Sequence, residues 1–152
     1  LLWHSARYEG FESSENVIYL GAAPNQHVVP LAAHVLENLD PRVYCLGSNY
    51  VWTWEINRVM RDILAAGGGR IVAERLVPLG ATALNKMVDD IASPAPGAVL
   101  HTLVRESAYS FYTPWHSPAS PPPDPARLPT PRLLPSHAAV TVPGHPTRAH
   151  PP

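Results

Sequence analysis

The stretch RVYCLGSNYVWTWEINRVMRDILAAGGG, residues 42–69, joins the pattern of a buried strand to that of an amphipathic helix. Residues 42–48 are apolar on both faces as far as Leu46, which is typical of a strand inside a parallel sheet. Residues 54–69 carry apolar side chains at helical spacing and end in three consecutive glycines, a common stop signal. The stretch therefore predicts a strand–turn–helix unit, and its turn contains aromatic and amide side chains instead of small polar ones.

The same alternation of strands and helices continues on both sides of this unit. Further strands are predicted at 16–22, 70–80 and 97–104, and helices at 26–39, 83–93 and from 106 to 112. Strands that alternate with helices of about 10–15 residues indicate βαβ units and a parallel sheet. The predicted fold class is α/β, with a Rossmann-like parallel sheet.

The composition changes abruptly after Tyr112. Thirteen of the 19 prolines lie beyond it, together with only four of the 23 Lys, Arg, Asp and Glu residues. Residues 113–152 are therefore predicted to be a Pro-rich disordered tail or polyproline II. The helix pattern stops in mid-course at this junction, which favours a truncation or a reading-frame change in the gene; a natural Pro-rich tail is the alternative.

The side-chain inventory argues against most classes of chemistry. The net charge of −1 gives no electrostatic reason to expect a nucleic acid or an anionic membrane as partner. Cys45, the single cysteine, lies in an apolar run, where burial makes a thiol inert. His27 and His34 have no Cys or carboxylate nearby in sequence, and no G-x-S-x-G elbow is present. We therefore expect no metal, no cofactor and no enzymatic activity.

A small-molecule binding surface fits the remaining residues better. Ligands of parallel α/β sheets bind outside the carboxyl ends of the strands. Tyr50 and Trp52 follow the end of the strand at 42–48, and residues 102–107 follow the end of another, so both segments would line one rim. Aromatic walls with nearby amides and hydroxyls suit a small planar solute. For Trp52, packing in the core is the competing interpretation.

Two further blocks of the sequence are distinctive: YEGFESSENVIYLGAAPNQ, residues 8–26, and GSNYVWTWEIN, residues 47–57. They resemble the type I periplasmic-binding-protein family, within it the branch of urea and short-chain amide receptors. The branch contains the substrate-binding proteins of urea and amide ABC transporters and the amide-sensing regulator of aliphatic amidase expression. The resemblance covers residues 2–112 and implies a fragment of a two-lobed receptor. It implies that residues 1–39 end the first lobe and that 40–112 form an incomplete second lobe, followed by the unrelated tail 113–152.

The resemblance also implies the ligand-binding residues. Tyr50 and Trp52 stand at the positions of the aromatic pair that contacts the ligand, and Ser48 belongs to the same block. His4 and Ala6 stand where relatives carry an aromatic and a small hydroxyl residue in a Pro-containing loop. Residues 53–55 read TWE where relatives usually carry Pro-Arg-Glu or Pro-Arg-Thr.

Three functions follow from the resemblance as expectations. The first is a solute receptor for urea, short-chain amides or amino acids that delivers to an ABC transporter permease, in the periplasm or at the cell surface. The second is a cytoplasmic amide sensor that holds an antiterminator-type regulator inactive. The third is a truncated remnant without function. Because a partial sheet exposes apolar surface and strand edges, self-association is also expected.

Overall fold

The computed structural model describes residues 1–84, 86–116 and 132–135. Its strands are β1 (Leu2–His4), β2 (Val17–Tyr19), β3 (Arg42–Ser48), β4 (Arg70–Val77), β5 (Ala98–Thr102) and β6 (Arg132–Pro135). Its helices are the 3-10 turn η1 (Pro24–Gln26), α1 (Val28–Asn38), α2 (Val51–Ala66), α3 (Met87–Ala92) and α4 (Glu106–His116). Strands and helices alternate along most of the chain, which confirms the α/β class.

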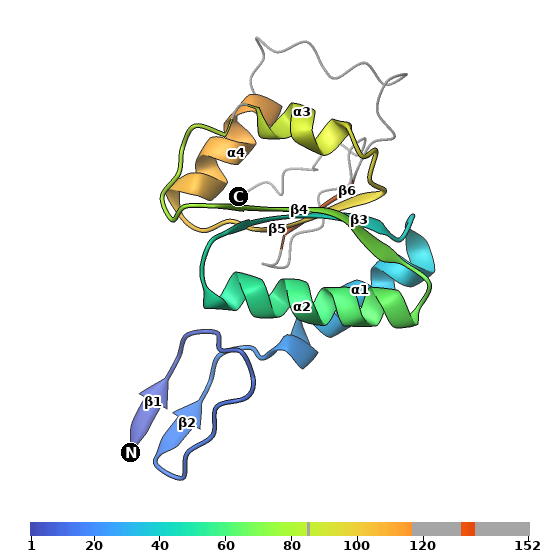
Figure 1. The fold of residues 1–152 in the computed structure, drawn as a ribbon. Helices are drawn as coiled ribbons and strands as arrows, with labels where there is room; N and C mark the ends of the chain where they lie inside the picture. The colour runs from blue at the N-terminus through green and yellow to red at the C-terminus, as the bar shows by residue number, and fades with distance from the viewer. Residues whose placement is uncertain (85, 117–131, 136–152) are drawn as a thin grey trace, which may run out of the picture.

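A parallel four-stranded sheet in the order β4-β3-β5-β6 forms the centre of the molecule. Figure 1 shows α1 and α2 on one side of this sheet and α3 and α4 on the other. Helices on both faces explain why β3 and β5 are buried along almost their whole length. The sheet is therefore the doubly covered parallel type that the sequence predicts.

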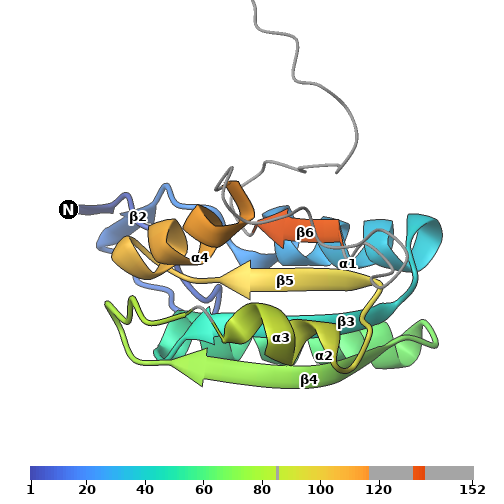
Figure 2. The same ribbon diagram turned by 90° about the horizontal axis from the view of Figure 1, so that it is seen from above.

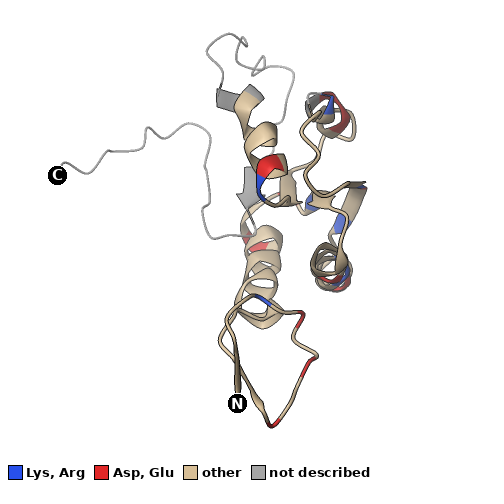
Figure 3. Cartoon of the chain, turned by 90° about the vertical axis from the view of Figure 1, so that its left-hand side faces the viewer, with Lys and Arg blue, Asp and Glu red and all other residues tan. Residues whose placement is uncertain are grey.

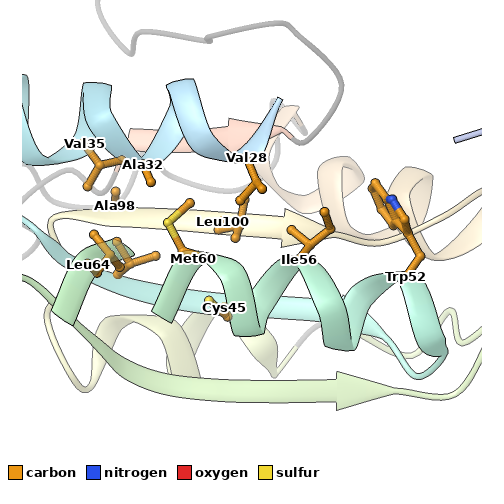
Figure 4. Packing of buried hydrophobic residues seen from close by; sticks show 11 residues of the cluster. Val28, Ala32, Val35, Cys45, Trp52, Ile56, Met60, Leu64, Ala98 and Leu100 are labelled. Carbon is orange, nitrogen blue, oxygen red and sulfur yellow. The ribbon is translucent and has the colours of Figure 1, made fainter. Parts of the chain in front are cut away.

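Two apolar cores lie on the two faces of the sheet. One joins α1, α2, β3 and β5 through Val28, Ala32, Val35, Val43, Cys45, Trp52, Ile56, Met60, Leu64, Ala98 and Leu100 (Figure 4). The other packs α3, α4 and the residues around them through Tyr44, Leu46, Val77, Leu84, Ile91, Val99, Leu103 and Phe111. Helix α1 thus shares a core with β3 and α2; the division between 39 and 40 remains a prediction from the resemblance.

Strands β1 and β2 form a separate parallel two-stranded sheet, here called the ribbon. The ribbon lies beyond α1 and α2 in Figure 1, and none of its residues is buried. In Figure 2 the arrowheads of β4 and β5 point to the side where the N-terminal segment lies. The chain that follows β1 therefore runs past the carboxyl edge of the four-stranded sheet.

Boundaries of α2, α3 and α4 differ from the predicted ones. Helix α3 begins at Met87, four residues later than predicted. Helix α2 begins at Val51, three residues earlier than predicted, so Trp52 lies in its first turn. Its end follows the prediction: Gly68 has φ of +81°, which a glycine adopts without a steric penalty, and the Gly69 N–H donates to the Leu64 carbonyl. Helix α4 continues past Tyr112 to His116.

The segment 113–152 holds the end of α4, up to His116, and one strand, and its composition predicted neither. Strand β6 pairs in parallel with β5, with Ala98 opposite Arg132. This pairing is found within the segment for which the sequence predicts a Pro-rich tail, and the boundary at 113 stays a prediction. The prediction for 117–131 and 136–152 lies outside the described residues.

Candidate functional site

A cavity of about 430 Å³ lies at the carboxyl edge of the sheet. Three parts of the chain line it: the segment after β1, the beginning of α2 and the turn after β5. Its lining residues are Ala6, Arg7, Glu9, Tyr50, Trp52 and Val104. We call it the site cavity. Its volume lies within the range of small-molecule pockets.

The two aromatic rings of the site cavity come from the start of α2. Tyr50 is the residue that caps this helix, in an extended conformation, and Trp52 lies in its first turn. Their ring centroids are 6.2 Å apart with an interplanar angle of 32°. Trp52 is 5% exposed and also belongs to the core beneath α1 and α2. It therefore lines the cavity and packs in the core at the same time. Figure 4 shows its ring at the end of that row of core side chains.

Charged groups of both signs reach the site cavity from the N-terminal segment. The Arg7 guanidinium carbon lies 5.8 Å from the centroid of the Trp52 ring, a distance that suits a cation–π contact. Glu9 lines the cavity as well, and burial together with a hydrogen bond to Glu12 raises the pKa of its carboxyl group. Burial also raises the pKa of the Tyr50 hydroxyl, which stays a neutral donor at pH 7.

His27, the residue that caps the start of α1, borders this aromatic group. Its ring centroid lies 6.1 Å from that of Trp52. Burial, together with the positive charge of Arg7, lowers the pKa of His27, so its imidazole is neutral at pH 7. His27 therefore places an uncharged ring beside Trp52, outside the residues that line the cavity.

Ser48 supports the site cavity through a hydrogen bond to one of its lining residues, Val104. It is fully buried at the end of β3, and its Oγ accepts a hydrogen bond of 3.3 Å from the Val104 N–H. This bond joins the turn after β3 to the turn after β5. Ser48 itself is not among the residues that line the cavity.

The predicted site residues are thus brought together in part. Ala6, Tyr50 and Trp52 line one cavity, and Ser48 supports it from behind. His4 lies elsewhere, in the ribbon, where its ring packs 5.6 Å from Tyr19 and 6.3 Å from Tyr8. Pairing of β1 with β2 places it there, because His4 stands opposite Tyr19 in the parallel register.

Three lining residues were not named as site residues by the sequence. Val104 belongs to the 102–107 segment that was expected at the same rim, so the topology already pointed to it. Arg7 and Glu9 flank Tyr8 in a loop without periodic pattern, and only the path of the folded chain shows that they reach the cavity.

Other candidate chemistry is not assembled within the part of the chain that the structure describes. Among those residues no three His, Cys, Asp or Glu side chains are grouped in a way that would hold a metal ion. Cys45 is fully buried, and burial raises the pKa of its thiol to about 12. Of the described helices, none combines the length and the apolar composition that a membrane span requires.

Comparison with known proteins identifies the family. The model of the periplasmic binding protein domain matches residues 1–120. The chain belongs to this family. The match includes every residue that lines the site cavity and both faces of the sheet up to α4.

Solved structures of ABC-transporter proteins share the fold. A solute-binding protein of an ABC transporter from R. palustris, in complex with 4-hydroxybenzoate, is 17% identical, with a TM-score of 0.62 over 80% of this chain. Another from R. palustris, in complex with benzoate, is 18% identical, with a TM-score of 0.58 over 64% of this chain. A putative branched-chain amino acid ABC transporter from Rhodospirillum rubrum is 19% identical, with a TM-score of 0.54 over 68% of this chain. The chain spans only 27%, 32% and 31% of the benzoate, 4-hydroxybenzoate and Rhodospirillum proteins respectively.

Proposed function

We propose that this chain is part of the solute receptor of an ABC importer, and that the site cavity holds one side of the solute. The expected solutes are urea, short-chain amides and amino acids, and the partner is the transporter permease. Such a receptor works in the periplasm or at the cell surface. The observation that carries the proposal is the meeting of Ala6, Tyr50 and Trp52, from two distant segments, in one cavity at the carboxyl edge of the sheet.

The chemistry of the cavity supports a small planar solute. Two aromatic rings supply flat apolar walls, and Ala6 and Val104 complete an apolar lining. The neutral Tyr50 hydroxyl and the Arg7 guanidinium are hydrogen-bond donors, which suit a carbonyl or carboxylate oxygen. Benzoate and 4-hydroxybenzoate, bound in two structures of similar fold, are planar solutes with such oxygens.

The open shape of the site also agrees with a receptor that encloses its solute from two sides. Binding of a small polar solute must offset the loss of its translational and rotational freedom, and a few hydrogen bonds on one wall offset little of it. We therefore expect weak affinity, in the millimolar range at about −4 kcal/mol, from the wall described here alone.

Calorimetric titration of the chain with urea, acetamide, leucine and benzoate tests the proposal. We expect saturable heat with at least one of them, and Tyr50→Ala should weaken that binding about tenfold, as expected for the loss of an aromatic wall. Tyr109→Ala is the matched control, because Tyr109 is 77% exposed on α4 and does not line the cavity.

Two outcomes would contradict the proposal. One is the absence of heat with all four solutes while circular dichroism shows folded protein. The other is binding that Tyr50→Ala and Tyr109→Ala leave equally unchanged, since the solute would then lie outside the site cavity.

A further inference from the structure

A second cavity, of about 590 Å³, lies between the β1–β2 loop and η1. We call it the loop hollow. The loop contributes Tyr8, Glu9 and Phe11, the end of β2 contributes Tyr19, and η1 contributes Asn25 and Gln26. Glu9 is shared with the site cavity, whereas the aromatic rings of the two cavities are different residues.

Aromatic ring faces form much of the loop hollow. The Tyr8 and Tyr19 rings stack with centroids 4.7 Å apart and an interplanar angle of 28°. The Phe11 ring already binds a cation, because the Arg58 guanidinium carbon lies 5.6 Å from its centroid. The face of an aromatic ring carries partial negative charge, so rings gathered in a hollow attract cations.

The loop hollow carries a negative charge, as the ring faces carry a partial negative charge. Among the described residues Glu9 is the one charged side chain that lines it. The loop from 5 to 16 carries Glu9, Glu12 and Glu15 against the single cation Arg7, as Figure 3 shows near the N-terminus.

The two nearest carboxyl groups also repel each other. Glu12 raises the pKa of Glu9 through a hydrogen bond and through its charge, and Glu55 adds to this effect. A cation beside Glu9 would offset the repulsion between these carboxylates. Arg58, the cation that contacts the Phe11 ring, is held by Glu55 at 2.8 Å and by Asp62 at 3.5 Å.

We propose that the loop hollow is a second binding site, for a small organic ammonium ion that pairs with Glu9 and rests against the Tyr8 and Tyr19 rings. Aromatic rings combined with a carboxylate recognise quaternary and alkylated ammonium groups, because such cations are weakly hydrated and gain from ring faces. A divalent metal is a poorer match, since the hollow offers one carboxylate and no group of three ligands among the described residues.

Two probes of the same shape and different charge test this proposal. Choline carries a quaternary nitrogen, and 3,3-dimethylbutan-1-ol replaces that nitrogen with a neutral carbon. We expect choline, titrated into the isotope-labelled full chain at pH 7, to shift the backbone amide signals of 8–11 and 19–26 with saturation. The neutral probe should bind about tenfold more weakly or worse.

Variants assign the effect to the named groups. Glu9→Gln should lower choline affinity about tenfold and leave the neutral probe unchanged, because it removes charge and keeps shape. Glu37→Gln, at an exposed carboxylate on α1, is the matched control. Tyr19→Leu should lose choline binding, and Tyr19→Phe should retain it. If Glu9→Gln does not fold, the pair Tyr19→Leu and Tyr19→Phe still tests the site, because Tyr19 lines the same hollow.

Three results would overturn the proposal. They are equal binding of the two probes, amide shifts outside the loop hollow, and choline binding that disappears in Tyr50→Ala. The last result would place the cation in the site cavity instead.

Discussion

The four-stranded sheet and the ribbon are both parallel, yet they are stabilised very differently. Every residue of β5 is buried, because helices cover both faces of the sheet and β3 and β6 flank the strand. No residue of β1 or β2 is buried, and Leu2 and Trp3 are 61% and 64% exposed. Backbone hydrogen bonds alone therefore contribute little to the stability of a strand, and burial of its two faces contributes more.

The largest loss of stability should come from a cavity in the core between the four-stranded sheet and helices α1 and α2. Leu64 is fully buried beneath α1, and Leu64→Ala removes three heavy atoms from the core of Figure 4. We expect the free energy of unfolding to fall by about 2–5 kcal/mol. Urea denaturation followed by circular dichroism measures this. If Leu64→Ala lowered the free energy of unfolding no more than a substitution in the ribbon does, burial of the sheet would not explain its stability.

A buried histidine on the other face should make the sheet sensitive to acid. His101, 3% exposed on β5, is hydrogen-bonded through Nε2 to the Tyr112 hydroxyl, and burial lowers its pKa to about 4. Unfolded, the same group takes up its proton near pH 6.5. The unfolded state therefore binds more protons between these values, and stability present above pH 6.5 is lost as the pH falls toward 4.

The expected loss across this window is up to about 3 kcal/mol. Denaturation midpoints from pH 7 to pH 4 measure it, and carboxylates that titrate in the same range are separated by His101→Gln, which should flatten the pH dependence. Identical pH profiles for the two proteins would show that His101 does not carry the effect.

Close packing of side chains against Gly47 should make the end of β3 intolerant of one added methyl group. A Cβ at Gly47 would clash with the side chains of Thr102 and Thr53, both fully buried. Gly47→Ala should cost about 1–3 kcal/mol, because the close-packed neighbours have no room to move. The thermal melting midpoint reports this, and an unchanged value would mean that the junction of β3 and α2 is looser than described.

The smallest effect on folding should come from the ribbon itself. Trp3→Ser should change the free energy of unfolding by no more than about 0.5 kcal/mol, because Trp3 is already exposed. The same change removes apolar surface and should lower self-association, which light scattering against concentration measures. A strongly destabilised Trp3→Ser would show that the ribbon is part of the cooperative unit.

The sequence predicted the elements whose pattern is local. Residues 42–48 and 70–77 are strands and α2 ends at its glycines, because burial on two faces and a helix stop both appear in neighbouring residues. Strand β1 and strand β6 are three and four residues long, and each exists only through a partner distant along the chain. Strands this short show no hydrophobic periodicity from which they could be predicted.

The site shows the same limit. Tyr50 was predicted from its place after the strand at 42–48 and again from the family motif, whereas Ala6 came from the motif alone. Both line one cavity at the carboxyl edge of the sheet. His4 came from the same motif, but the register of the ribbon places it beside Tyr19. Arg7 and Glu9 depend on the course of an irregular loop, which their residue types do not encode.

The Ser48–Val104 hydrogen bond sets the aperture of the site cavity. One end of that bond lies two residues before Tyr50, and the other belongs to a residue of the opposite wall. The backbone spacing of the two turns is therefore held by a main-chain amide and a buried hydroxyl that lies behind the lining side chains. Substitution at 50 or 104 would then change the side chains that face the solute, while the backbone that carries them would stay in place.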